Sequence, residues 1–196
     1  GEHNAVRLAH LASLGLPLER RTVLDLGCGT GDHAVFYLRR HCTVTVVDAR
    51  PECLARLRER LNLAWTELAS RPGTRCVDLN DVGSLDDVEV HDVVHAYGIL
   101  YHLDQPARFI AAAARACSDF MVLETCVARD ERDGAGDVNV FEEGGAHDAT
   151  QAAGGRGCRP TRQWLFAELR KHFPYVCQTR TQPDHPEFPV DWTTRT

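Results

Sequence analysis

The sequence of 196 residues has no apolar stretch near the ~20 residues that a bilayer-spanning helix needs. Its polar first ten residues, GEHNAVRLAH, contain no signal-peptide core, so we expect a cytoplasmic protein with no membrane partner. It has no long basic run, and its net charge is −6. Nucleic-acid binding needs a concentrated positive surface, so we do not expect a nucleic-acid partner. Internal repeats are also absent, and 43% hydrophobic residues over this length predict a single domain spanning residues 1–196.

The eight cysteines form no C-x-x-C pair, which argues against a zinc ribbon and against a thioredoxin-type redox site. Several of them lie inside apolar runs such as HCTVTVV and YVCQT, where a small buried thiol is the ordinary interpretation. We therefore predict reduced cysteines in an intracellular compartment and no metal site.

Strand-like and helix-like segments alternate along most of the chain. Strands are predicted over residues 22–27, 42–49, 74–81, 90–98 and 120–127, and helices over 4–14, 32–41, 51–61, 105–117 and 161–173. This order predicts an α/β fold: a Rossmann-like, doubly wound, mostly parallel sheet of six or seven strands with helices on both faces. A sixth strand is predicted over 175–182, and a seventh would have to come from 187–196.

The stretch VLDLGCGTGDH, residues 23–33, runs from a hydrophobic strand into a turn with three glycines, where a backbone can approach a ligand closely. A nucleoside-triphosphate loop needs Lys and Ser or Thr after its last glycine, but Asp32 and His33 follow Gly31 here. In a dinucleotide fingerprint that starts at Gly27, the third glycine would fall at position 32. The pattern therefore disfavours a nucleotide hydrolase and leaves a dehydrogenase as a minor alternative.

The spacing Asp25-x-Gly27-x-Gly29-x-Gly31 resembles the first motif of class I S-adenosylmethionine-dependent methyltransferases. Carboxylates suit that ligand, because it carries an ammonium and a sulfonium in place of a pyrophosphate. The resemblance implies S-adenosylmethionine as the cofactor and S-adenosylhomocysteine as the product. It also implies that Asp48 binds the ribose hydroxyls and Asp78 the adenine. The full set of cofactor-binding residues that it implies is Asp25, Gly27, Cys28, Gly29, Gly31, His33, Asp48, Ala49, Asp78, Leu79 and Tyr97.

Two narrower resemblances add to this. Four stretches, NAVRLAHLASLGL, GDH, ETCV and GCRPTRQW with the following RTQPDHPEFPVDW, resemble a group of small stand-alone bacterial methyltransferases over almost the whole chain. The run GILYH, residues 98–102, locally resembles the bacterial enzyme that carboxymethylates the wobble uridine of tRNA.

For the acceptor, the sequence offers candidates but no identity. We predict Tyr101, His102 and Glu124 as catalytic residues because they follow the fourth and fifth strands, where the acceptor would approach the methyl group. The predicted substrate-binding residues are Tyr101, His147, Gln151, Arg159, Arg162 and Trp164. Around residues 129–159, the glycine-rich segment is predicted to be a lid or insertion that excludes water.

The function predicted from these features is in-line methyl transfer to oxygen or nitrogen of a small molecule, by a monomer or homodimer. Two alternatives stay open at this point: an RNA-modifying methyltransferase, and a non-catalytic module that binds S-adenosylmethionine.

Overall fold

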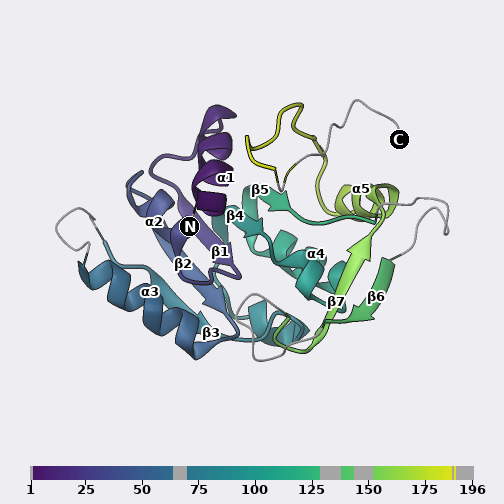
Figure 1. Cartoon of the computed structure of the whole chain (residues 1–196), viewed down its shortest axis with the longest axis horizontal. Coiled ribbons are helices and arrows are strands. Elements are labelled where there is room, and N and C mark those ends of the chain that lie inside the picture. The colour runs from purple at the N-terminus through teal and green to yellow at the C-terminus, as the bar shows by residue number, and fades with distance from the viewer. Residues whose placement is uncertain (1, 64–69, 129–137, 144–151, 187, 189–196) are drawn as a thin grey trace.

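The structure is a computed structural model that describes residues 2–63, 70–128, 138–143, 152–186 and 188 (Figure 1). Five parallel strands form the central sheet in the order β3-β2-β1-β4-β5. These strands are β1 (Thr22–Leu26), β2 (Thr43–Asp48), β3 (Gly73–Cys76), β4 (His91–Tyr97) and β5 (Cys117–Glu124). The helices are α1 (Glu2–Ser13), α2 (Asp32–Leu38), α3 (Pro51–Leu63), α4 (Pro106–Arg115) and α5 (Arg162–Arg170), with short 3-10 turns η2 (Val82–Leu85) and η3 (Leu100–His102).

The direction of winding reverses between β1 and β4, which pair side by side although β2 and β3 lie between them in the chain. In an open parallel sheet, this reversal leaves a crevice at the carboxyl ends of the two strands, where ligands bind. The segments that follow β1 and β4 therefore position the candidate site.

Alternating residues of the strands divide the core into two layers, one on each face of the sheet. Val23 and Val93 pack with Leu11, Tyr37 and other residues of the first layer. In the second layer, the next residues along the same strands, Leu24 and Val94, pack with side chains of α4 and its surroundings. Because successive strand residues point to opposite faces, the near-continuous apolar strands fill both layers.

The predicted Rossmann-like class is confirmed, but the central sheet has five strands instead of the predicted six or seven. The predicted sixth strand, 175–182, is wrong, because this segment forms no strand and most of its residues are exposed. Its apolar start has no surface to cover, as the 87% exposed side chain of Tyr175 shows. The proposed seventh strand, 187–196, lies outside the described residues except for Phe188, which belongs to no strand.

Part of the predicted lid segment forms a separate antiparallel ribbon of two strands, β6 (Val138–Glu142) and β7 (Arg156–Pro160). Figure 1 shows this ribbon on the side of the molecule opposite α3, with β7 leading into α5. The ribbon and the central sheet are distinct sheets, and β7 lies against η3, directly after β4.

All eight cysteines are free, as predicted, and four of them are buried. A search of the described helices finds none with the length and apolar character of a membrane span.

The glycine turn after β1 is tied to helices on both sides through Asp32. The Asn4 side chain donates to Asp32 Oδ2 at 2.8 Å, and Arg60 Nη2 lies 2.7 Å from Oδ1. Burial alone would raise the pKa of Asp32, but the hydrogen bonds from Asn4 and Arg60 outweigh it and lower the pKa to about 2.

This tie predicts an acid-dependent contribution to stability. Because the pKa of Asp32 in the folded chain lies below its ordinary value of 3.8, the ionised group stabilises the fold above about pH 4. That stabilisation is lost as the pH falls toward 2. Asp32→Asn should therefore lower the free energy of unfolding by about 1 kcal/mol at pH 7, after allowance for the exposed Arg60 partner, and by less at pH 3. Urea denaturation at both pH values checks this, and an equal loss at the two would contradict it.

Candidate functional site

The glycine turn lies directly on the end of β2. The amides of Gly27 and Cys28 both donate to the carbonyl of Val47, at 2.8 and 3.0 Å. Gly29 has a φ of 52° and open space where a side chain would be, so the backbone there is accessible to a ligand. A side chain at Gly27 would instead lie 2.8 Å from Ile99, which follows β4. The turn is thus packed against the neighbouring strand ends and open above Gly29.

Asp48, at the end of β2, is hydrogen-bonded to the glycine turn. Its Oδ2 accepts from the Gly29 amide at 2.8 Å, and its Oδ1 accepts from the Arg50 amide at 2.9 Å. Burial raises the pKa of Asp48, although these two backbone donors oppose the rise. Each carboxylate oxygen has a second lone pair, so Asp48 can still accept the two hydroxyls of a ribose.

Below the turn, Asp25 and three aromatic rings form a buried polar cluster. Asp25 is fully buried, and neither of its oxygens has a hydrogen-bond partner among the described residues. Its nearest charge partner is His33, with Nδ1 at 3.8 Å from Oδ1. His95 pairs with Asp25 in the strand register, and its Nδ1 lies 2.9 Å from the Tyr37 hydroxyl. Burial lowers the pKa of His95, so this imidazole stays neutral.

A fully buried carboxylate without donors is costly, and a cation would compensate it. The role of Asp25 beside the ammonium of the cofactor stays a prediction. Cys28 is also buried at the turn, and its thiol lies 3.6 Å from the Gly29 carbonyl.

The remaining predicted cofactor residues follow β2 and β3. Ala49 comes directly after Asp48, and its carbonyl accepts from the Cys76 thiol at 3.7 Å. Asp78 is exposed, and its Oδ1 accepts from the Asn80 amide at 2.9 Å. Leu79 is buried in the second core layer. Asp25, Asp48 and Asp78 therefore lie at the carboxyl ends of β1, β2 and β3, which are neighbours in the sheet.

The acceptor side begins at Tyr97, the last residue of β4. The Arg7 guanidinium lies over the Tyr97 ring, 5.3 Å from its centroid. Arg7 also forms an ion pair with Glu124 at the end of β5. A side chain at Gly98 would lie 3.2 Å from Arg7 Nη2 and 3.6 Å from the Tyr101 hydroxyl. Glu124 therefore reaches this region as the partner of a buried arginine that the sequence analysis missed.

Arg7 gave little signal in the sequence, because it lies 117 residues from Glu124 in a helix that precedes the glycine turn. Its position on the inward-facing stripe of α1 with Leu11 was the available clue, since an arginine there must find a partner.

Tyr101 and His102 lie in η3, and the ribbon with the adjoining Glu143 contacts both. His102 Nδ1 lies 2.8 Å from Glu143 Oε2, and this buried carboxylate also accepts from the Ala152 amide at 2.7 Å. Gly157 of β7 approaches so closely that a side chain there would lie 2.5 Å from the Tyr101 carbonyl. Glu143 is the second functional residue that sequence reasoning missed, because no local pattern links it to His102.

The other predicted substrate-binding residues do not lie together in the structure. Arg159 of β7 stacks on Tyr101 and on Phe141, with its guanidinium carbon 5.1 and 4.8 Å from the two ring centroids. Trp164 instead lines a different hollow, of 300 Å³, between α4 and the ribbon. Arg162 starts α5, while His147 and Gln151 lie outside the described residues.

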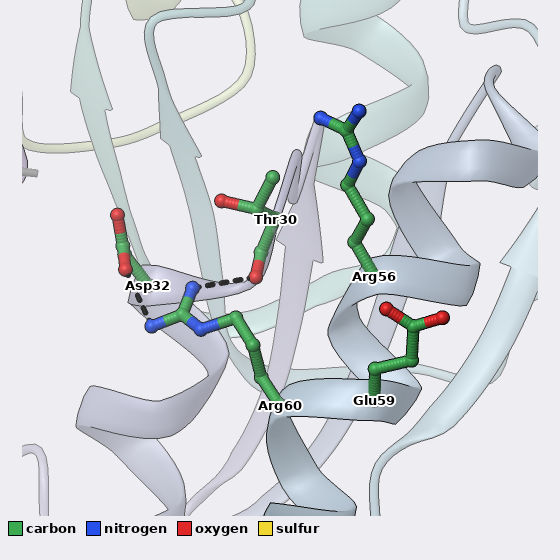
Figure 2. Close-up of a pocket in the computed structure, with 5 residues that line it drawn as sticks. All are labelled: Thr30, Asp32, Arg56, Glu59 and Arg60. Atoms are coloured by element: carbon green, nitrogen blue, oxygen red, sulfur yellow. Dashed lines mark hydrogen bonds and ion pairs between the residues drawn. The ribbon is translucent and has the colours of Figure 1, made fainter.

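A hollow of 520 Å³ lies on the α3 side of the turn and is lined by Thr30, Asp32, Arg56, Glu59 and Arg60 (Figure 2). Figure 2 shows Arg60 reaching from α3 to both Thr30 and Asp32. Its Nη1 donates to the Thr30 carbonyl at 2.6 Å. The lining of this hollow includes none of the strand-end carboxylates Asp25, Asp48 and Asp78.

The sequence profile of the methyltransferase domain family matches residues 23–119, which run from the start of β1 into β5 and include the glycine turn, Asp48 and Asp78. The chain is a class I S-adenosylmethionine-dependent methyltransferase. S-Adenosylmethionine is therefore its methyl donor. No curated protein sequence matches this methyltransferase significantly.

Solved structures share the fold at low sequence identity. The N-terminal domain of EvdMO1, determined in the presence of S-adenosylhomocysteine and D-fucose, is 22% identical with a TM-score of 0.70, covering 86% of this chain and 71% of that one. The glycopeptide N-methyltransferase MtfA, complexed with S-adenosylhomocysteine, is 16% identical with a TM-score of 0.60, covering 85% and 77%. Magnesium protoporphyrin IX methyltransferase from Synechocystis PCC 6803, with bound S-adenosylmethionine, is 15% identical with a TM-score of 0.57, covering 87% and 68%.

The packing of the turn predicts different costs for two glycine substitutions. Gly31 has a φ of 85°, and a side chain there would lie 2.1 Å from Leu57 Cδ1. Gly15 has a φ of 67° but open space, so Gly15→Ala should show the backbone cost alone, about 1 kcal/mol. Gly31→Ala adds the steric conflict and should cost about 2–4 kcal/mol. Urea denaturation measures both, and equal losses would refute the close approach of Leu57.

Asp48→Asn should weaken donor binding. The amide can accept from only one of the two backbone N–H groups and presents its own N–H₂ to the other, so both the turn and the ribose contact suffer. We expect at least about a tenfold rise in the Kd for S-adenosylhomocysteine, measured by calorimetry. Asp92→Asn is the matched control. Asp92 also accepts from a backbone amide, that of Thr22 at 2.8 Å, but it lies at the amino end of β4, away from the glycine turn. A similar rise in both variants would contradict a direct role for Asp48.

Proposed function

We propose that this methyltransferase acts on an oxygen or nitrogen of a small molecule. The proposal rests on the contacts between the β6–β7 ribbon and η3. Glu143 binds His102, and Gly157 meets the Tyr101 carbonyl so closely that no side chain fits between them. Cys158 adds a contact from its thiol to the Leu100 carbonyl at 3.3 Å. A crevice covered in this way suits a small acceptor better than a long polymer.

Two neighbours in the structural comparison support this acceptor class by analogy. One was determined with D-fucose present, and another is a glycopeptide N-methyltransferase. The net charge of −6 points the same way, because an RNA substrate needs a basic surface.

On the donor side, we propose that the strand-end carboxylates hold the cofactor as the resemblance implies. Asp48 would accept the ribose hydroxyls, Asp78 would lie beside the adenine, and Asp25 would balance the ammonium. S-Adenosylmethionine supplies a methyl carbon activated by its sulfonium, so the chain itself has to align an acceptor and manage its proton.

For a hydroxyl or ammonium acceptor, we propose His102 as the general base. The Nδ1–H of His102 would donate a hydrogen bond to the Glu143 carboxylate at 2.8 Å, which leaves the lone pair on Nε2. The ionised carboxylate would stabilise the imidazolium that forms when Nε2 takes the proton from the acceptor. Burial raises the pKa of Tyr101, so its phenol stays protonated at neutral pH and acts as a hydrogen-bond donor. Glu124, held by Arg7, positions this end of the site.

The segment 129–159 is proposed to act as the cover of the acceptor site. Its described parts, 138–143 and 152–159, already supply Glu143, Gly157 and Arg159 to that site. Water excluded by such a cover cannot compete with the acceptor for the methyl group.

The test is radiolabel transfer from methyl-labelled S-adenosylmethionine to a panel of hydroxyl and amine compounds, with total RNA as a parallel substrate. Label should enter a small molecule and leave RNA unlabelled. For a hydroxyl acceptor, His102→Ala should lower kcat by roughly 10²–10⁴ with little change in S-adenosylhomocysteine affinity.

The control is His172→Ala, which removes an imidazole beside Glu168 at the end of α5. It should leave turnover unchanged. Labelled RNA with unlabelled small molecules would contradict the proposed acceptor class. Equal losses of turnover and donor affinity in His102→Ala would contradict its role as a base.

A further inference from the structure

Arg159, beside the proposed acceptor residues, is like Arg40 a half-buried arginine with no acidic partner among the described residues. Arg7 pairs with Glu124, Arg21 lies 3.2 Å from Asp119, and Arg75 lies 2.7 Å from Asp87. Arg159 is half-buried in β7 and has no ion pair with any described residue. A partly desolvated guanidinium without a carboxylate is unusual in a folded chain, since buried charges are normally paired.

Two aromatic rings lie close to the Arg159 guanidinium. Its carbon lies 4.8 Å from the centroid of Phe141 and 5.1 Å from that of Tyr101. Each such cation–π contact is favourable and limits the orientations that the side chain adopts. The cost of ordering a long flexible side chain is therefore met before any ligand binds.

The edge of the guanidinium remains available. Nη1 donates to the Cys158 carbonyl at 2.9 Å, while Nε and Nη2 have no hydrogen-bond partner among the described residues. These two nitrogens form the side-on fork of arginine, whose parallel N–H groups match the two oxygens of a carboxylate.

The fork lies beside the proposed acceptor residues. Arg159 and Gly157 are two residues apart in β7 and so share one side of the strand, and Gly157 meets the Tyr101 carbonyl. The nearby Glu143 carboxylate hydrogen-bonds His102 and the Ala152 amide through Oε2, and it forms no ion pair with Arg159.

We propose that the acceptor carries an oxyanion, a carboxylate in the first instance, which binds bidentately to Nε and Nη2 of Arg159. The proposal rests on the small-molecule function above and specifies its substrate class: small acids in which the methylated oxygen or nitrogen lies apart from the anchoring group. Neutral sugars and simple amines without an acidic group would lack the anchor.

The experiment is an NMR titration of the nitrogen-15-labelled chain, saturated with S-adenosylhomocysteine, with benzoate and with its neutral isostere benzamide. Benzoate should shift the Arg159 Nε–H resonance in a saturable way, and benzamide should not. Phenyl phosphate forms a third arm, and tighter binding of it than of benzoate would identify the oxyanion as a phosphate.

Arg159→Gln should weaken benzoate binding at least about tenfold, the loss expected for a charge-assisted pair of hydrogen bonds. Arg159→Lys keeps the charge but loses the fork, so it should retain only part of the affinity. Arg156→Gln removes the same charge from the same strand, where Arg156 is exposed beside Asp104 and Glu142, and should bind benzoate like the wild type.

Calorimetry with S-adenosylhomocysteine, run on every variant, reports whether each one is folded and separates the two proposals. Loss of donor binding by the wild-type chain would contradict the methyl-transfer function. The benzoate titration is repeated without S-adenosylhomocysteine, so it decides the role of Arg159 in that case too. Equal benzoate affinity in the wild type and Arg159→Gln, or no measurable benzoate binding, would overturn the oxyanion proposal.

Discussion

The donor half of the site depends on the hydrogen bonds that fix the glycine turn to the end of β2. The Val47 carbonyl accepts from Gly27 and Cys28, and the Asp48 carboxylate accepts from Gly29. These bonds join the turn to the residue that is proposed to bind the ribose, so the two parts of the donor site cannot move independently. Arg60 and Asn4 add ties from α3 and α1 through Asp32. Polar groups fixed in this way would bind the cofactor at little conformational cost.

Most of this half was predictable from the sequence. The β-branched strands, the helix that follows the glycines and the acidic residues at strand ends are local patterns, and the family motif states their spacing. The five strands of the sheet follow from the same patterns within a few residues of their observed ends. The prediction failed at 175–182, where an apolar start resembled a strand but no neighbouring edge pairs with it. Strand formation there depends on tertiary context, which a single segment does not contain.

For the proposed acceptor side, the sequence indicated candidate residues but not their contact partners. His102, Glu124 and Arg159 were chosen from their positions after strands or near a distinctive motif. The partners that decide their roles are remote: Glu143 lies 41 residues from His102, and Arg7 lies 117 residues from Glu124. Long-range pairs of this kind leave no periodic signal. No pattern around Trp164 indicated that it would line a hollow between α4 and the ribbon, where neither Arg159 nor Tyr101 contributes to the lining.

The ribbon is a separate two-stranded sheet that joins the rest of the molecule through η3, and this arrangement has an evolutionary consequence. The predicted cofactor-binding residues come from 25–97, whereas the ribbon comes from beyond residue 137, so the two parts of the candidate site are encoded apart. A change in the ribbon alters what lies against Tyr101 and His102 without touching the glycine turn. Relatives of this chain could therefore acquire new acceptors by exchanging one short hairpin, while the chemistry of methyl donation stays constant.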